Sequence, residues 1–184
     1  MAKKPQIIQQ KQIAKTRLFC IEELALKFSN GEERIFERMV SGRSGAVMII
    51  AVTDNKEFIL IREYSAGTHD YQLAFPKGLM EEGETIVQAA NRELMEEVGY
   101  GAKQLTPLKS MSLAPGYFSH QMNLILAQDL YPEKLPGDEP EPLELVFWPI
   151  DEIDSLLQQT DFTEARSIAG LLLAKRYLTQ EAAF

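Results

Sequence analysis

The sequence predicts an α+β domain in which a few helices pack against a mixed β-sheet, preceded by a separate N-terminal antiparallel sheet. Short apolar runs bounded by turn residues occur at residues 46–52, 58–61, 122–127 and 143–148, which is typical of strands. Apolar spacing changes to three and four positions at residues 86–98, which indicates a helix. Because 184 residues suit one domain, we expect a single domain, with N-terminal strands at 1–45 and the core at 46–184.

The predicted elements follow one another with clear turn signals. Residues 19–36 alternate around Ser29-Asn30-Gly31, and an Asn-Gly pair favours a β-hairpin. The runs at 46–52 and 58–61 flank Asp54-Asn55, which predicts a second hairpin. The proline-rich, acidic stretch 136–142 suits an exposed loop rather than a helix or a central strand. Residues 150–157 and 164–177 are helical by their period.

The helix at 86–98 is the best-defined element. Thr85 with Gln88 three positions later fits a capping box, and Gly99 is a usual C-terminal stop. The apolar stripe of this helix consists of Val87, Ala90, Leu94 and Val98.

Composition excludes several classes of function. The net charge of −8 disfavours nucleic acid as the main partner. No stretch of about 18 apolar residues is present and residues 1–11 lack a secretory signal, so we expect a cytoplasmic protein with no membrane partner. A single cysteine, Cys20, excludes an internal disulfide framework and a thiolate zinc site.

Three glutamates on the predicted helix are the candidate metal ligands. At about 100° per residue, Glu93, Glu96 and Glu97 fall within one arc, away from the apolar stripe. Neighbouring carboxylates repel one another, and a hard divalent cation such as Mg²⁺ relieves this repulsion with oxygen ligands and substrate phosphates. The alternative interpretation is a solvated acidic helix face.

The preceding loop favours the metal site over a solvated face. Pro76-Lys77-Gly78 and Glu82-Gly83-Glu84 lead into the helix, and glycines let backbone carbonyls approach an ion or a phosphate. Arg92 can bind Glu84 and so hold this loop on the helix.

These residues resemble the Nudix box. The spacing is Gly-x5-Glu-x7-Arg-Glu-Leu-x-Glu-Glu-x-Gly, carried by Gly78, Glu84, Arg92, Glu93, Leu94, Glu96, Glu97 and Gly99. The sequence has Tyr100 where the family usually carries an aliphatic residue, and the side chain at this position serves packing. The box covers residues 78–100, and the surrounding strand pattern resembles the Nudix α/β/α sandwich.

The resemblance implies metal-dependent hydrolysis of a nucleoside diphosphate linked to another group. Glu93 and Glu97 would be the principal ligands of Mg²⁺, which Mn²⁺ can replace, with Glu96 assisting and Gly78 at the metal loop. Glu84 and Arg92 would support the geometry of the loop and the helix as part of the catalytic set.

Sequence outside the box resembles one branch of the family, the ADP compounds hydrolases. Pro115 within residues 113–118 matches the proline typical of ADP-ribose and ADP-sugar pyrophosphatases, and residues 61–64, 75–78 and 130–142 are similar to that branch. The resemblance implies release of AMP from ADP-ribose, ADP-sugars, diadenosine polyphosphates and NADH. Arg62, Tyr117 and Phe118 are the candidate contacts to this nucleotide substrate.

Related enzymes also imply a glutamate base on a loop after the box and a homodimer with an exchanged N-terminal sheet. Here Glu139 and Glu141, beside Pro140 and Pro142, are the candidates for the base; a merely solubilising loop is the alternative. Residues 19–36 are the candidate dimerisation arm. Two other functions remain open: a nucleoside triphosphate or capped-RNA pyrophosphatase, and a non-catalytic ADP-ribose or nucleotide sensor.

Overall fold

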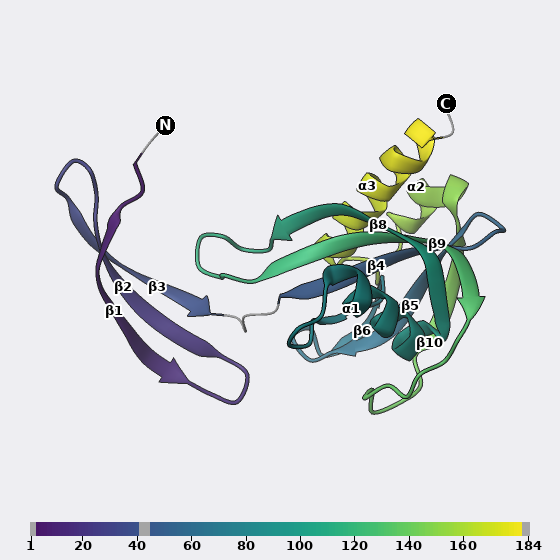
Figure 1. Ribbon diagram of the computed structural model, residues 1–184, viewed down its shortest axis with the longest axis horizontal. Coiled ribbons are helices and arrows are strands. Elements are labelled where there is room, and N and C mark those ends of the chain that lie inside the picture. Colours follow the sequence, from purple (N-terminus) through teal and green to yellow (C-terminus); the bar gives the residue numbers. More distant parts are fainter. Residues whose placement is uncertain (1–2, 41–44, 182–184) are drawn as a thin grey trace. The chain divides into compact units, whose positions relative to one another are not determined.

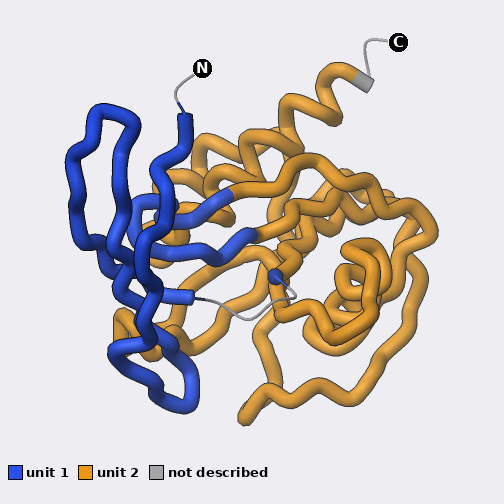
Figure 2. The backbone as a smooth tube through the Cα atoms, turned by 60° about the vertical axis from the view of Figure 1, so that its left-hand side comes forward, with its two compact units in different colours: residues 1–45, 112–121 blue, residues 46–111, 122–184 orange. Residues whose placement is uncertain are grey.

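The computed structural model describes residues 3–40 and 45–181, which belong to two compact units (Figure 2). Unit 1 comprises residues 1–45 and 112–121, and unit 2 comprises residues 46–111 and 122–184. Among the described residues, no helix combines the length and the apolar character needed to cross a membrane.

Unit 1 contains a three-stranded antiparallel sheet in the order β1-β2-β3 (Figure 1), formed by β1 (Gln6–Lys15), β2 (Cys20–Lys27) and β3 (Glu33–Val40). The predicted hairpin is confirmed. Gly31 has a φ of 88°, which favours glycine, and the Glu32 N–H donates to Asn30 Oδ1 at 3.1 Å. Residues 112–121 belong to this unit because Met39 bonds to Tyr117 and Ser119 through backbone hydrogen bonds of 2.7 and 3.1 Å.

Unit 2 contains a seven-stranded mixed sheet, which confirms that prediction (Figure 1). The order is β10-β5-β4-β9-β8, with β6 beside β5 and β7 beside β4; β4 and β9 run parallel, whereas β4 and β5 run antiparallel. The strands are β4 (Ala46–Val52), β5 (Glu57–Ser65), β6 (Asp70–Ala74), β7 (Lys77–Leu79), β8 (Tyr100–Ser112), β9 (Gln121–Pro132) and β10 (Glu144–Pro149).

Helices cover both faces of this sheet. Along the fully buried β4, alternate side chains point to opposite faces. Ile49 belongs to the core cluster that includes Ala90 and Leu94, whereas Ile50 contacts the position of Gly170 on the opposite face. The sheet therefore lies between α1 (Ile86–Glu93) and α3 (Ala165–Glu181), as an α/β/α sandwich predicts. Two short helices precede α3: η2 (Ile150–Glu152) and α2 (Ile153–Leu156).

The helix predicted at 86–98 has a different C-terminal half. Its capping box at Thr85 and its left-handed stop at Gly99, with a φ of 83°, are confirmed. However, α1 ends at Glu93 and continues as a π-helix, η1 (Leu94–Val98), in which the Gly99 N–H bonds to the Leu94 carbonyl at 3.1 Å. Periodicity could not reveal this change because a π-turn inserts a single residue into an otherwise regular pattern.

The prediction of N-terminal strands within residues 1–45 did not locate β1, and no strand was predicted at the position of β8. Every residue of β1 is exposed, so its sequence has no buried face and no clear alternation. Strand β8 contains Pro107, and this is tolerated because β8 lies at the edge of the sheet.

Helix α3 fixes the segment that leads to β7. The fully buried Ser167 accepts a hydrogen bond from the Phe75 N–H at 3.1 Å and donates to Glu164 at 3.0 Å. The Pro76 carbonyl accepts a hydrogen bond from the Ile49 N–H at 2.8 Å. The backbone before Lys77 and Gly78 is thus bound to the core strand β4 and to α3.

Candidate active site

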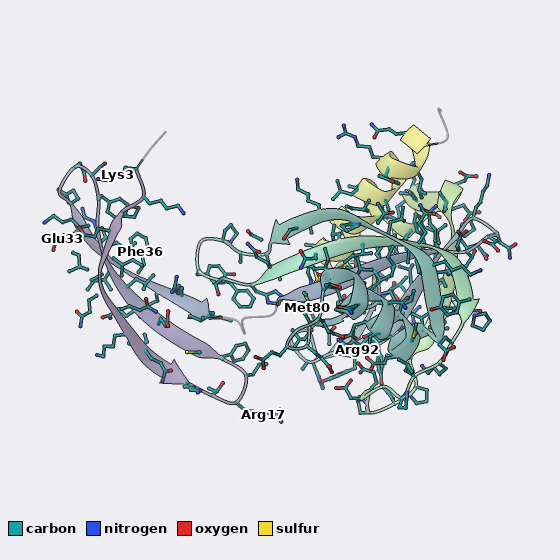
Figure 3. The ribbon with its side chains drawn as sticks, viewed as in Figure 1. Lys3, Arg17, Glu33, Phe36, Met80 and Arg92 are labelled. Atoms are coloured by element: carbon teal, nitrogen blue, oxygen red, sulfur yellow. The ribbon has the colours of Figure 1, made fainter. Side chains whose placement is uncertain are left out.

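Arg92, on the last turn of α1 (Figure 3), binds three of the predicted site carboxylates. Its Nε and Nη2 donate to Glu84 at 2.8 and 3.0 Å. Its Nη1 donates to Glu93 and Glu96, each at 2.8 Å. The hydrogen bonding between Arg92 and Glu84 lowers the pKa of Glu84 and raises the pKa of Arg92. The predicted link between the loop and the helix therefore forms, and it extends to two further glutamates.

Gly78 on β7 leaves room for the Glu93 carboxylate. A Cβ atom at position 78 would lie 2.0 Å from Glu93 Cδ, well inside any permitted contact. Glu93 is 9% exposed. Its pKa is raised, because the effect of burial exceeds the opposing effect of the Arg92 charge and hydrogen bond. The glycine is therefore required by this close approach rather than by backbone conformation.

Glu97 is the most deeply buried carboxylate of the predicted set, at 7% exposure. Its Oε2 accepts a hydrogen bond from the Lys77 N–H at 2.9 Å. Burial raises the pKa of Glu97 to about 8, with the negative charges of Glu93 and Glu63 adding to the shift. An ionised Glu97 would therefore be stabilised by an additional nearby cation.

Glu139, on the acidic loop, lines the same cavity as Glu93 and Glu97. The cavity measures about 500 Å³ and is lined by Lys77, Gly78, Leu79, Met80, Glu81, Arg92, Glu93, Glu96, Glu97, Pro136, Gly137, Asp138 and Glu139. Burial raises the pKa of Glu139, as do the charges of Glu63 and Asp138. Glu141 does not line this cavity; it lines a neighbouring cavity of about 320 Å³ together with Glu96, Glu97 and Glu139, and it accepts a 2.6 Å hydrogen bond from Tyr71.

The residues around this cavity fit a hard divalent cation. Glu93 and Glu97 supply carboxylate oxygens that are nearly buried, and the space above Gly78 admits one of them against the backbone. In residues 3–40 and 45–181, no three acidic, histidine or cysteine side chains already converge on one point as metal ligands. Instead, Arg92 binds one oxygen of Glu93, and the Lys77 N–H binds one oxygen of Glu97.

The predicted substrate contacts lie in both units. Arg62 on β5 forms ion pairs with Asp161 and, at 3.1 Å, with Glu144, all within unit 2. Tyr117 and Phe118 belong to unit 1, where Tyr117 is 61% exposed.

Three charged residues near the cavity were missed by the sequence prediction. Glu63 forms an ion pair with the Lys77 ammonium group, and both groups act electrostatically on Glu97. Asp138 lines the cavity and acts on Glu93 and Glu139. The available signal for Glu63 was its place two positions after the apolar run 58–61, where the buried part of β5 has ended.

We expect Gly78→Ala to lower the free energy of unfolding by about 1–3 kcal/mol, because Arg92 prevents the Glu93 carboxylate from moving aside freely. The matched control is Gly67→Ala, since nothing lies within 4 Å of a Cβ atom there. This control should change stability by less than about 0.5 kcal/mol. Urea denaturation measures both; equal stabilities for the two variants would contradict this account of Gly78.

Comparison with known proteins agrees with the geometry. The ADP compounds hydrolase NudE of Escherichia coli is 51% identical over 175 residues, which cover 95% of this chain and 94% of that protein. The ADP-ribose pyrophosphatase of Bacillus subtilis is 28% identical over 165 residues, covering 87% and 89%. A crystal structure of an ADP compounds hydrolase superposes with a TM-score of 0.93 at 50% identity, covering 98% of this chain and 97% of that one.

Two family profiles match almost the whole chain. The NUDIX domain matches residues 42–171, and the NudE-type Nudix hydrolase N-terminal domain matches residues 5–38. The chain therefore belongs to the Nudix hydrolase family and carries a NudE-type N-terminal domain.

Proposed function

We propose that this Nudix hydrolase uses Mg²⁺ to cleave the pyrophosphate bond of ADP-linked compounds and releases AMP. The observation that carries the proposal is the pair of nearly buried carboxylates, Glu93 and Glu97, beside a cavity of about 500 Å³. The relatives named for hydrolysis of ADP compounds and ADP-ribose support this choice of substrate.

Each residue of the site has a proposed role. Glu93 and Glu97 would be the principal metal ligands, Glu96 would assist them, and Gly78 would contribute from the loop before the helix. Bound Mg²⁺, or Mn²⁺ in its place, would neutralise phosphate charge and lower the pKa of a coordinated water. Arg92, through its bonds to Glu84, Glu93 and Glu96, holds the carboxylates in place.

The acidic loop supplies the base. A carboxylate of Glu139 or Glu141 accepts the proton of the attacking water. Arg62, Tyr117 and Phe118 are the proposed contacts to the nucleotide, whose linked group can be ribose phosphate, a sugar, a second adenosine nucleotide or the nicotinamide half of NADH.

The decisive assay compares Glu97→Gln with Glu82→Gln. Glu82 is an exposed glutamate of the loop before α1, so its substitution removes the same charge outside the cavity. With Mg²⁺ and ADP-ribose, diadenosine triphosphate or NADH, we expect Glu97→Gln to release AMP about 100-fold more slowly than wild type, and Glu82→Gln to match wild type. A chelator should abolish the reaction, and Mg²⁺ or Mn²⁺ should restore it.

The same assay separates the alternatives. Faster release of pyrophosphate from nucleoside triphosphates than of AMP from ADP-ribose would favour a triphosphate or capped-RNA pyrophosphatase. Tight binding of ADP-ribose with no turnover at any metal concentration would favour a nucleotide sensor. Either result would overturn the proposed activity.

A homodimer and a cytoplasmic location remain part of the proposal, with no nucleic-acid or membrane partner. The sheet of unit 1 supports the dimer, because large apolar side chains are exposed on it: Ile7, Ile8, Ile13, Ile35 and Phe36. Such a surface is more typical of an interface than of a solvated sheet.

Light scattering in solution tests the dimer. We expect a mass of twice the 20.8 kDa of one chain, because association would remove these apolar side chains from water. A mass of one chain at the protein concentration of the assay would contradict the dimer.

A further inference from the structure

The acidic loop between β9 and β10 is attached at its start to the end of the metal-binding helix. The Leu135 N–H donates to the Met95 carbonyl at 3.2 Å, and Lys134 Nζ donates to the Glu96 carbonyl at 2.5 Å. Carbonyls in the last turn of a helix lack partners within the helix, so these bonds satisfy groups that would otherwise need water. The start of the loop is therefore fixed to η1.

The end of the loop is attached to a different element, through one side chain. Tyr71 on β6 donates its hydroxyl to Glu141 Oε1 at 2.6 Å. Among the described residues, this is the one hydrogen bond that residues 136–143 make. Pro140 and Pro142 flank Glu141 and fix their own φ angles, which limits the conformations that the bond must select.

An aromatic contact with Tyr64 holds Tyr71 on its hairpin. Tyr64 on β5 lies opposite Tyr71 in the strand register, with ring centroids 5.8 Å apart and an interplanar angle of 69°. The Tyr64 hydroxyl bonds to His69 Nδ1 at 2.7 Å and so is directed to the hairpin turn rather than to the loop. The two tyrosines share one aromatic contact but place their hydroxyl groups on different partners.

The two loop glutamates therefore differ in their surroundings. Glu139 lines the cavity with Glu93 and Glu97, and no hydrogen bond from the described part of the protein occupies its carboxylate. Glu141 has one oxygen engaged by the Tyr71 hydroxyl and lines the neighbouring cavity of about 320 Å³ rather than the cavity that contains Glu93. Of the two loop glutamates, Glu139 is the one that lines the same cavity as Glu93.

We propose that Tyr71 is a positioning residue, which binds Glu141 as an anchor and thereby holds Glu139 towards the attacking water. This inference rests on the proposed hydrolysis. In that reaction the water oxygen bonds to phosphorus, its proton passes to Glu139, and the bridging oxygen leaves with the other phosphate. Glu141 thus serves as a hydrogen-bond acceptor and not as the base.

Four substitutions separate the anchor from the base. Tyr71→Phe and Glu141→Ala both remove the bond, so each should lower kcat for ADP-ribose about tenfold with KM changed less than about twofold. Glu141→Gln keeps an amide oxygen that accepts the Tyr71 hydroxyl, so its kcat should stay within about threefold of wild type. Glu139→Gln should lose about 100-fold or more.

Tyr64→Phe is the matched control because it removes the hydroxyl from the other ring of the same aromatic pair. It should retain the wild-type kcat. Combining Tyr71→Phe with Glu141→Ala should cost no more than either change alone, because both remove one bond. If Glu141→Gln is as inactive as Glu141→Ala, Glu141 itself reacts with the water and the assignment is wrong.

Backbone mobility of the loop gives a readout without substrate. In Tyr71→Phe, the ¹⁵N order parameters of Gly137, Asp138, Glu139 and Glu141 should fall below those of wild type, whereas Tyr64→Phe should leave them unchanged. Unchanged order parameters and unchanged kcat in Tyr71→Phe would overturn the anchor. An inactive wild-type protein would instead overturn the proposed hydrolysis, and the comparison of order parameters would still decide whether Tyr71 holds the loop.

Discussion

The site depends on one constraint: two buried carboxylates need partners that offset the free-energy cost of removing their charges from water. Glu93 and Glu97 are both less than a tenth exposed at one end of the same helix, and removing an ionised carboxylate from water costs several kcal/mol unless partners offset it. Arg92 is the positively charged partner of Glu93. The Lys77 N–H donates a hydrogen bond to one carboxylate oxygen of Glu97. These partners do not fully offset the burial of Glu97, because its pKa is still raised to about 8.

The fold delivers these partners from segments that are far apart in sequence. The end of β7 passes close beside α1, and Gly78 lets the Glu93 carboxylate lie against the backbone of that strand. The hydrogen bond between Ser167 on α3 and the Phe75 N–H anchors the chain just before β7. The acidic loop, which also lines the cavity, is attached to the helix end through Leu135 and to the β5–β6 hairpin through Tyr71. Helix α1, strand β7 and the β5–β6 hairpin therefore together hold the carboxylates of the site in place.

Local signals in the sequence were sufficient for the helix ends and for the bond between Glu84 and Arg92. Thr85 and Gly99 act on their immediate neighbours, and Arg92 reaches the loop that directly precedes its own helix. The hairpin at Asn30-Gly31 was predictable for the same reason.

Features set by distant packing could not be predicted. Treating the helix as regular placed the glutamates on an arc away from the apolar stripe, yet Glu93 and Glu97 are buried and Val87 is 37% exposed. Gly78 on β7 lies against the Glu93 carboxylate, and a π-helix replaces the regular helix from Leu94 to Val98; neither feature leaves a periodic signature. The roles of Glu63 and Lys77 also depend on pairing across the sheet, and single-sequence patterns do not report such pairing.

The central claim, that Glu93 and Glu97 bind a divalent cation, is tested most directly by titrating Mn²⁺ and following free Mn²⁺ by electron paramagnetic resonance. We predict binding by the wild-type protein, about tenfold or more weaker binding by Glu93→Gln and by Glu97→Gln, and wild-type affinity for Glu82→Gln. Equal Mn²⁺ affinity in all four proteins would contradict the assignment of these carboxylates as metal ligands.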